Sequence, residues 1–486
     1  MKRVVAIATL LAAMPLRAGS VAVAQHAALA TSSPQATQIG LGILKRGGNA
    51  IDAAVAVALA LGDIGGGGFL VYYDAASRSV WTLDFSEVAP ADAKTIAREG
   101  AASAAVPGTI AGLAAMRDRF GTLPWSQLVE PAIRLAQDRN QKELVTTLQR
   151  VAQKGAIDFY DGETAKLIVE GVRANGGTIG NRDLRDYKPV WRAPIKITFH
   201  EYDIYALPPP SAAGLMIGEE LNILAGFDLK NAGDHSAAVI HLMAEASRRA
   251  ALDRDKYVGD PTTLRTPYRE VLSVDRAKQW RASIDVHRAT PTMTLAPDAP
   301  TTTASAHTTH FSIVDAHGNI AAVTTSLGDE NGSGFVVPKC GFFLNDAMKD
   351  FSTKSASPNE IAGGKRIATP IAPTIILRRG TPFLVLGASG GAAIPNILLQ
   401  SFLSIALFGK SLPDAVDAAR FDQQASPEDM SCEHLKMPAD TIARLRAMGH
   451  GVREVESIGD IEALMIETNR ITAVSDPRHG GAAGGY

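Results

Sequence analysis

The sequence predicts an α+β fold in which strands gather in the middle of the molecule and helices lie on both sides of them. Ala50 to Leu61 is apolar almost all round, as expected of a buried helix. Thr308 to Val314 and Ile320 to Ser326 are rich in β-branched residues, and the connection between them carries Gly318 and Asn319. This pattern is typical of an antiparallel hairpin.

Composition and charge exclude several classes of protein. The chain has 486 residues, of which 46% are hydrophobic and 20% charged, so it can bury a large core and lacks a disordered composition. The formal net charge of −2 provides no basic surface, so we do not expect a nucleic-acid partner. Cys340 and Cys432 cannot build a metal site by themselves. We expect them to be separate small hydrophobic residues, with a disulfide between them as the alternative.

The N-terminus resembles a secretory signal peptide. Lys2 and Arg3 precede an apolar run from Val4 to Leu16, and small residues at Ala22 to Ala24 form a plausible cleavage site. The apolar run is too short to span a bilayer comfortably. We therefore expect removal of residues 1–24, a periplasmic or secreted protein and no stable membrane insertion. An uncleaved membrane anchor is the alternative.

The first helices have clear start signals. Ser33 and Pro34 are suited to the N-cap and first position of a helix that ends at Gly47. Asn49 can cap the next helix, with Asp52 in its first turn.

Four glycines, Gly65 to Gly68, lead into a predicted strand from Phe69 to Tyr73. Such a run can cradle phosphate, but no Lys-Ser/Thr pair follows it and no helix begins there. Close packing against another backbone is the better explanation.

Further elements follow along the chain. The region from Arg265 to Ala306 is rich in Pro, Thr and Arg and is expected to be a long surface connection. The other expected strands and helices are Val80 to Phe85, Gly108 to Phe120, Trp125 to Asp138, Ala165 to Asn175, Ile195 to Phe199, Ile204 to Ala206, Ala237 to Tyr257, the hairpin of Thr374 to Leu377 with Phe383 to Leu386, Asn396 to Leu407, and Leu412 to Arg420.

Thr308 opens one strand of the predicted hairpin. If the His307–Thr308 bond breaks, the freed α-amine of Thr308, with an ordinary pKa of about 7.7 to 8, can activate its own hydroxyl. One residue then supplies both nucleophile and base. Taken alone, the threonines are fully explained by a half-buried strand, which is the commoner case.

Ordered motifs along nearly the whole chain after residue 30 resemble the γ-glutamyltransferase family of N-terminal nucleophile hydrolases. The segment from Thr308 to Asp315 is similar to the processing site of that family. The other matching segments are Leu44 to Ala54, Gly65 to Phe69, Val106 to Leu113, Glu130 to Ala136, Phe343 to Phe351, Gly387 to Gly391, and Asp476 to Arg478.

The resemblance implies a four-layer αββα sandwich and self-cleavage between His307 and Thr308. A large fragment, residues 25–307, and a small one, 308–486, would stay associated as a heterodimer. Ser326 matches a hydroxyl that positions the nucleophile, and the amides at Gly390 and Gly391 match the oxyanion site. We expect no cofactor and no metal site. Its substrates are small amides, and the acyl group passes to water or to an amine.

The predicted acyl-binding positions depart from the family. Ser86 stands where the family has an arginine for the α-carboxylate of a γ-glutamyl group, and Ala368-Thr369 replaces a serine pair. On the α-amino side, Gly328 and Ala347 replace polar residues, and only Asp350 is kept. These losses predict an altered acyl specificity.

Two other interpretations stay open. One is true γ-glutamyl hydrolysis or transfer on glutathione-like substrates, with Lys339 or Arg366 as the substitute cation. The other is a degenerate relative that only binds ligands.

Two further patterns compete with Thr308. Gly387 to Gly391 fits the Gly-x-Ser-x-Gly nucleophile elbow, which would make Ser389 the nucleophile. The candidate bases for Ser389 are His434, His450 and His479. His307 and His310 resemble a metal pair, but their spacing in a strand places them on opposite faces. We expect His310 to be a structural hydrogen-bonding residue.

Overall fold

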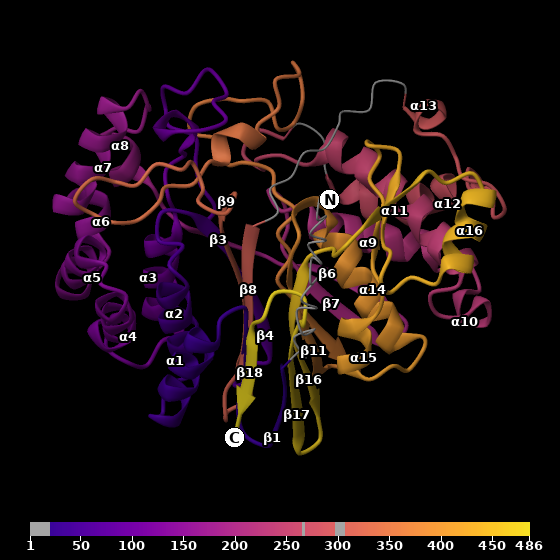
Figure 1. Ribbon diagram of the computed structural model, residues 1–486, viewed down its shortest axis with the longest axis horizontal. Helices are drawn as coiled ribbons and strands as arrows, with labels where there is room; N and C mark the ends of the chain where they lie inside the picture. The colour runs from indigo at the N-terminus through magenta and orange to yellow at the C-terminus, as the bar shows by residue number, and fades with distance from the viewer. Residues whose placement is uncertain (1–19, 265–267, 297–306) are drawn as a thin grey trace, which may run out of the picture.

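The computed structural model describes residues 20–264, 268–296 and 307–486 (Figure 1). Two β-sheets lie in the middle, with helices on the outer side of each. The mixed helix and sheet architecture confirms the predicted fold class at this level. A seven-stranded antiparallel sheet has the order β18 (Ala482–Gly485), β2 (Ala28–Thr31), β8 (His307–Val314), β9 (Ile320–Gly328), β3 (Gly67–Asp74), β4 (Ser79–Asp84) and β5 (Val190–Arg192).

The second sheet has eight strands. Its order is β1 (Ser20–Ala24), β17 (Arg470–Ser475), β16 (Asp460–Glu467), β11 (Thr381–Leu386), β10 (Thr374–Arg378), β7 (Tyr202–Ala206) and β6 (Ile195–Phe199), and β12 (Ala388–Ser389) also pairs with β16. A small separate sheet contains β13 (Phe421–Asp422), β14 (Met430–Glu433) and β15 (Val452–Val455).

Side chains on β3 show how the sheets are packed. Leu70 and Tyr72 join the core beneath the N-terminal helices, whereas Phe69 and Val71 join a second core with Ile375 of β10 and other residues of the eight-stranded sheet. Because successive strand residues point to opposite faces, β3 contacts helices on one side and the other sheet on its second side. The two sheets therefore pack face to face.

The N-terminal helices cover the outer face of the seven-stranded sheet, at the left of Figure 1. They are α1 (Pro34–Lys45), α2 (Ala50–Leu61), α3 (Thr109–Phe120), α4 (Trp125–Asp138), α5 (Lys142–Lys154), α6 (Ile157–Asp161), α7 (Glu163–Ala174) and α8 (Asn181–Asp186), with a 3₁₀ turn η1 (Ala101–Ser103). Helix α2 is almost wholly buried, as its apolar sequence predicts.

A second set of helices covers the eight-stranded sheet, at the right of Figure 1. They are α9 (Ala213–Leu224), α10 (Leu229–Ala232), α11 (Ala237–Tyr257), α12 (Val274–Ala282), α13 (Thr292–Leu295), α14 (Ile394–Ala406), α15 (Leu412–Asp417) and α16 (Ala439–Ala447). Three more 3₁₀ turns are η2 (Tyr268–Leu272), η3 (Ala347–Asp350) and η4 (Gly391–Ala393).

The helix caps and the close backbone contacts that the sequence predicts are present in the structure. The Ser33 side chain caps α1, and Asn49 with Asp52 forms a reciprocal capping box on α2. A Cβ at Gly65 or Gly66 would lie 2.0 Å from a backbone carbonyl oxygen of Phe343 or Ser326. The glycine run is therefore required for close backbone packing, as expected.

Several expectations were wrong or incomplete. The stretch from Arg265 to Ala306 is no plain connection, because its described part contains η2, α12 and α13. Helix α5 and strands β16 and β17 were not predicted. Cys340 and Cys432 are both free and buried, so no disulfide joins them.

The predicted signal peptide lies only partly within the described residues. Ser20–Ala24 pair with β17 as an edge strand, with Val21 and Val23 exposed, in the uncleaved chain. Removal of residues 1–24 stays a prediction. Among the described residues, no helix has both the length and the apolar character needed to cross a membrane.

Candidate active site

Thr308 lies at the start of β8, directly opposite Ser326 on β9. The two hydroxyl oxygens are 3.5 Å apart, and the amide of Gly328 donates to Ser326 Oγ at 2.9 Å. The pairing is irregular between His307 and Thr308, so the predicted cleavage bond coincides with a break in the ladder. The hairpin thus brings the predicted nucleophile beside the hydroxyl expected to position it.

His310 supports this strand from within the core. One ring nitrogen contacts Thr324 Oγ1 at 2.7 Å and the other contacts Ser312 Oγ at 3.0 Å. Burial lowers the pKa of His310 to about 3, so the ring is neutral. Both nitrogens are occupied by hydroxyl groups, as expected for a structural residue and not for a metal ligand.

Gly387 packs against the His310 ring. A Cβ at residue 387 would lie 2.1 Å from His310 Cε1. We expect Gly387→Ala to reduce the free energy of unfolding by about 1–3 kcal/mol, because the buried ring has no room to move. Urea denaturation measures this loss. Gly42→Ala is the control, since its Cβ would meet only Arg46 Nη1 at 3.6 Å, and an equal loss there would refute the explanation.

The predicted oxyanion donors lie where β12 ends and a helical segment begins. Gly390 has φ +130° and Gly391 has φ +57°, which are backbone conformations that favour glycine. Within the part of the chain that the structure describes, neither amide donates a hydrogen bond to a protein group. Both lie at the start of η4, which leads into α14. They are therefore available to stabilise developing negative charge.

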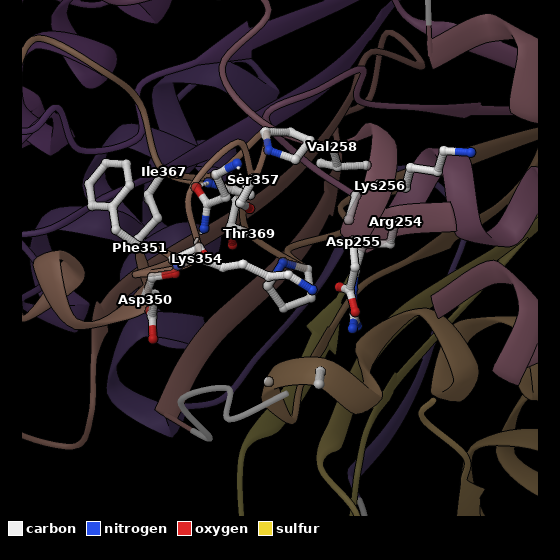
Figure 2. A pocket seen from close by; sticks show the side chains of 18 of the residues that line it. Arg254, Asp255, Lys256, Val258, Asp350, Phe351, Lys354, Ser357, Ile367 and Thr369 are labelled. Carbon is white, nitrogen blue, oxygen red and sulfur yellow. Dashed lines mark hydrogen bonds and ion pairs between the residues drawn. The ribbon is translucent and has the colours of Figure 1, made fainter. Parts of the chain in front are cut away.

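A cavity of about 860 Å³ contains most of the predicted site (Figure 2). Figure 2 shows Asp350, Phe351 and Ile367 at one end and Arg254 and Lys256 at the other. The predicted residues that line it are Thr308, Ser326, Gly328, Ala347, Asp350, Ala368, Thr369 and Gly391.

Ser86 is not part of this cavity, contrary to its predicted place among the acyl-binding residues. It is 1% exposed, and its hydroxyl donates to Asp84 at 2.6 Å. Arg366 donates to Asp84 at 3.1 Å and to the Ser86 carbonyl at 2.7 Å. Lys339 is exposed and does not line the cavity. Neither proposed substitute cation is thus positioned to bind an acyl group there.

Two carboxyl groups of the cavity have raised pKa values. Burial raises the pKa of Asp350 to about 7, and Lys349 and Arg98 partly oppose this effect. Burial raises the pKa of Glu87 to about 8. Glu87 was not predicted from the sequence as a site residue, although it directly follows Ser86.

A second cavity, of about 800 Å³, meets the first at Thr308. Its wall includes Gly390, Thr309 and Asp63. Thr325 Oγ1 donates to Asp63 at 2.8 Å, and burial raises the pKa of Asp63 to about 6. Thr308 therefore lines both cavities.

The geometry of Ser389 does not fit the alternative serine mechanism. Its hydroxyl donates to the carboxylate of Asp460, and His479 Nδ1 lies 3.6 Å from the same carboxylate. His434 Nδ1 instead contacts the Val455 carbonyl, and His450 contacts His241. None of the three predicted bases contacts the Ser389 hydroxyl.

We expect Ser389→Ala to keep both self-cleavage and most amidase activity, because no imidazole activates that hydroxyl. Gel analysis of cleavage and the rate of amide hydrolysis check this prediction. Loss of hydrolysis with cleavage intact would instead support Ser389 as the nucleophile.

One group of possible metal ligands occurs among the described residues. His241, Glu245 and His450 place their ligand atoms within 4.8 Å of one another. However, His241 Nδ1 and His450 Nε2 contact each other at 2.8 Å, and Arg249 donates to Glu245 at 2.7 Å. These contacts explain the group as a buried polar network.

Comparison with known proteins identifies the family. The family model of gamma-glutamyltranspeptidase matches residues 36–138 and 139–486. The chain is 33% identical to the glutathione hydrolase proenzyme of Escherichia coli (strain K12), over 94% of this chain and 91% of that protein. It is 30% identical to the acylase ACY 1 proenzyme of Pseudomonas sp. (strain SE83), over 80% and 81%. Its structure is similar to that of cephalosporin acylase from Bacillus halodurans, with a TM-score of 0.87, 25% identity and 99% of each chain covered.

These relatives define an enzyme of the N-terminal nucleophile hydrolase type. More particularly, the chain belongs to the gamma-glutamyltranspeptidase family. It is a γ-glutamyltransferase-like amidohydrolase or acyltransferase, and its relatives include both glutathione hydrolases and acylases. The family resemblance in the sequence is confirmed.

Proposed function

We propose that Thr308 is the nucleophile of a self-processing amidohydrolase with an acyl specificity altered from γ-glutamyl. The position of Thr308 carries this proposal. Its hydroxyl lies 3.5 Å from that of Ser326, and the residue lines both cavities, one of which also contains Gly391 and the other Gly390.

Maturation is the first reaction. The Thr308 hydroxyl attacks the carbonyl carbon of His307, the C–N bond breaks, and an ester joins the two residues. Water then hydrolyses this ester, which leaves a carboxylate on His307 and a free hydroxyl and α-amine on Thr308. The strand pairing is irregular at the bond that this reaction breaks.

Turnover uses the same hydroxyl. The α-amine accepts its proton as the oxygen attacks the substrate amide, and the amides of Gly390 and Gly391 stabilise the oxyanion, each donor being worth roughly 3–4 kcal/mol. The leaving amine takes the proton and departs, and an acyl ester remains on Thr308. Water or a second amine then accepts the acyl group.

The two fragments would remain together after cleavage. Both sheets combine strands from before and after residue 308; for example, β8 lies between β2 and β9, and β10 lies between β7 and β11. We infer that the sheets and their helices form the four-layer αββα sandwich, with residues 25–307 and 308–486 as a tightly associated heterodimer. The leader-like residues 1–24 support export to the periplasm or medium.

The cavity of about 860 Å³, which would hold the acyl group and is called the acyl cavity from here on, supports the altered specificity. The arginine position is occupied by the buried Ser86, and Gly328 and Ala347 offer no polar side chain to an ammonium group. A γ-glutamyl hydrolase acting on glutathione-like substrates is the second candidate, favoured by Asp350, which lines the cavity.

Trapping of the acyl-enzyme tests the proposed nucleophile. The purified protein is mixed with p-nitrophenyl pentanoate and quenched in acid, and the fragments are analysed by mass spectrometry. We expect one pentanoyl group on the small fragment, located at Thr308. A pentanoyl group on Ser389, or none on a cleaved protein, would contradict the proposal.

A further inference from the structure

The cations of the acyl cavity differ in whether they have partners. Arg276 donates to Asp253 at 2.6 Å, and Lys349 lies 2.6 Å from Asp346. These two cations are neutralised by carboxylates and have no free charge for a ligand. Their main effect is to hold the cavity wall in place.

The two cations at the other end of the cavity, Arg254 and Lys256, also have neighbours that interact with their charge. Arg254 pairs with Asp255 at 2.8 Å and donates to Gln424 at 2.9 Å. The Lys256 ammonium lies 5.1 Å from the centroid of the Tyr257 ring, and Figure 2 shows its side chain pointing away from the other labelled residues.

Arg98 is different. It lines the cavity, but within the described part of the chain its guanidinium makes no hydrogen bond, ion pair or ring contact. Its charge lowers the pKa of Asp350, whose carboxyl group also lines the cavity, against the larger effect of burial. A guanidinium without a partner beside an acyl site can bind a carboxylate through two parallel hydrogen bonds.

The neighbouring carboxyl groups do not neutralise Arg98 fully. Burial raises the pKa of Asp350 to about 7 and that of Glu87 to about 8, so both groups are substantially protonated near neutral pH. A protonated carboxyl group can donate a hydrogen bond to an anion and attracts an ammonium group only weakly. In this form the two groups leave the charge of Arg98 available to an anionic ligand in the same cavity.

Resting on the proposed function, we propose that Arg98 binds a terminal carboxylate of the acyl group, so that the preferred substrates are monoamides of short dicarboxylic acids without an α-amino group. The acyl carbonyl would lie at Thr308 and the carboxylate at Arg98, both of which line the same cavity. Arg98 would thus bind the carboxylate from a different loop, because the buried Ser86 position cannot bind it.

Three p-nitroanilides with five-carbon acyl groups test this proposal. Pentanoyl lacks the second carboxylate, glutaryl has it, and γ-glutamyl adds the ammonium group. We expect the wild-type kcat/KM to be highest for glutaryl. Arg98→Gln should lower the glutaryl value by about 10- to 100-fold, the factor expected for charged hydrogen bonds, with little change for pentanoyl. Arg98→Lys should restore part of the loss.

Lys256→Gln is the matched control, because it removes one cation from the same cavity without removing the free guanidinium. This control should leave the ratio of kcat/KM for glutaryl to kcat/KM for pentanoyl unchanged.

Three results would overturn the inference while leaving the Thr308 mechanism intact. In the first, Arg98→Gln lowers kcat/KM equally for both substrates; in the second, it lowers kcat/KM for neither. In the third, the wild-type enzyme has a higher kcat/KM for γ-glutamyl than for glutaryl. Failure of a cleaved wild-type enzyme to hydrolyse any of the three would overturn both.

Discussion

Replacing Thr308 with alanine is expected to leave the protein as one uncleaved chain without amidase activity. The substitution removes the hydroxyl that attacks His307 in the precursor and the substrate in the mature enzyme. Both reactions should fall to background, because Ser326 lies beside Thr308 and not at the cleavage bond. A denaturing gel and release of p-nitroaniline measure the two losses.

Thr308→Ser is the matched control for this substitution. It keeps a hydroxyl at the same position, so slow cleavage and residual hydrolysis should return. Hydrolysis by the Thr308→Ala variant at a substantial fraction of the wild-type rate would rule out Thr308 as the nucleophile, whatever the state of cleavage.

The second large effect concerns the oxyanion site. Gly390→Ala introduces a Cβ that would lie 2.9 Å from Ile397 Cδ1, at a residue with φ +130°. Because alanine is strained at this φ, we expect the backbone to shift and the amides of Gly390 and Gly391 to move away from the developing oxyanion. We expect kcat, normalised to the cleaved fraction, to fall by about 10²- to 10³-fold, with slower maturation.

Backbone strain alone must be separated from this effect. Gly380 also has a left-handed backbone, with φ +79°, but it lies in the exposed turn between β10 and β11, where an added Cβ would have no neighbouring atom within 4 Å. Gly380→Ala should therefore lower stability slightly and leave kcat unchanged. If both glycine variants lose kcat equally, the oxyanion assignment fails.

Local chemistry made much of the fold and site predictable. The cap at Asn49 and the close approach at Gly65 depend on neighbouring residues or on the absence of a Cβ, so the sequence shows them directly. The hairpin spacing likewise places Thr308 opposite Ser326. The start signals of α12 were also present, since Ser273 caps it and Asp275 lies in its first turn, but the Pro- and Thr-rich composition of the region obscured them.

Long-range pairing was not predictable in the same way. Arg366 donates a hydrogen bond to Asp84, 282 residues earlier in the chain, and only the folded structure shows that contact. Arg98 lies on a loop without a periodic pattern, so its place in the acyl cavity had no signal in the sequence. The order of β16 and β17 beside β1 and β11 also depends on pairing between distant segments.

The N-terminal residue of the small fragment tests the central claim most directly. Freshly purified wild-type protein is separated under denaturing conditions, and the small fragment is analysed by intact mass and N-terminal sequencing. The proposed mechanism predicts a fragment of residues 308–486 with Thr308 first. A chain that stays whole, or a fragment that begins at another residue, would contradict the assignment of Thr308 as a self-released nucleophile.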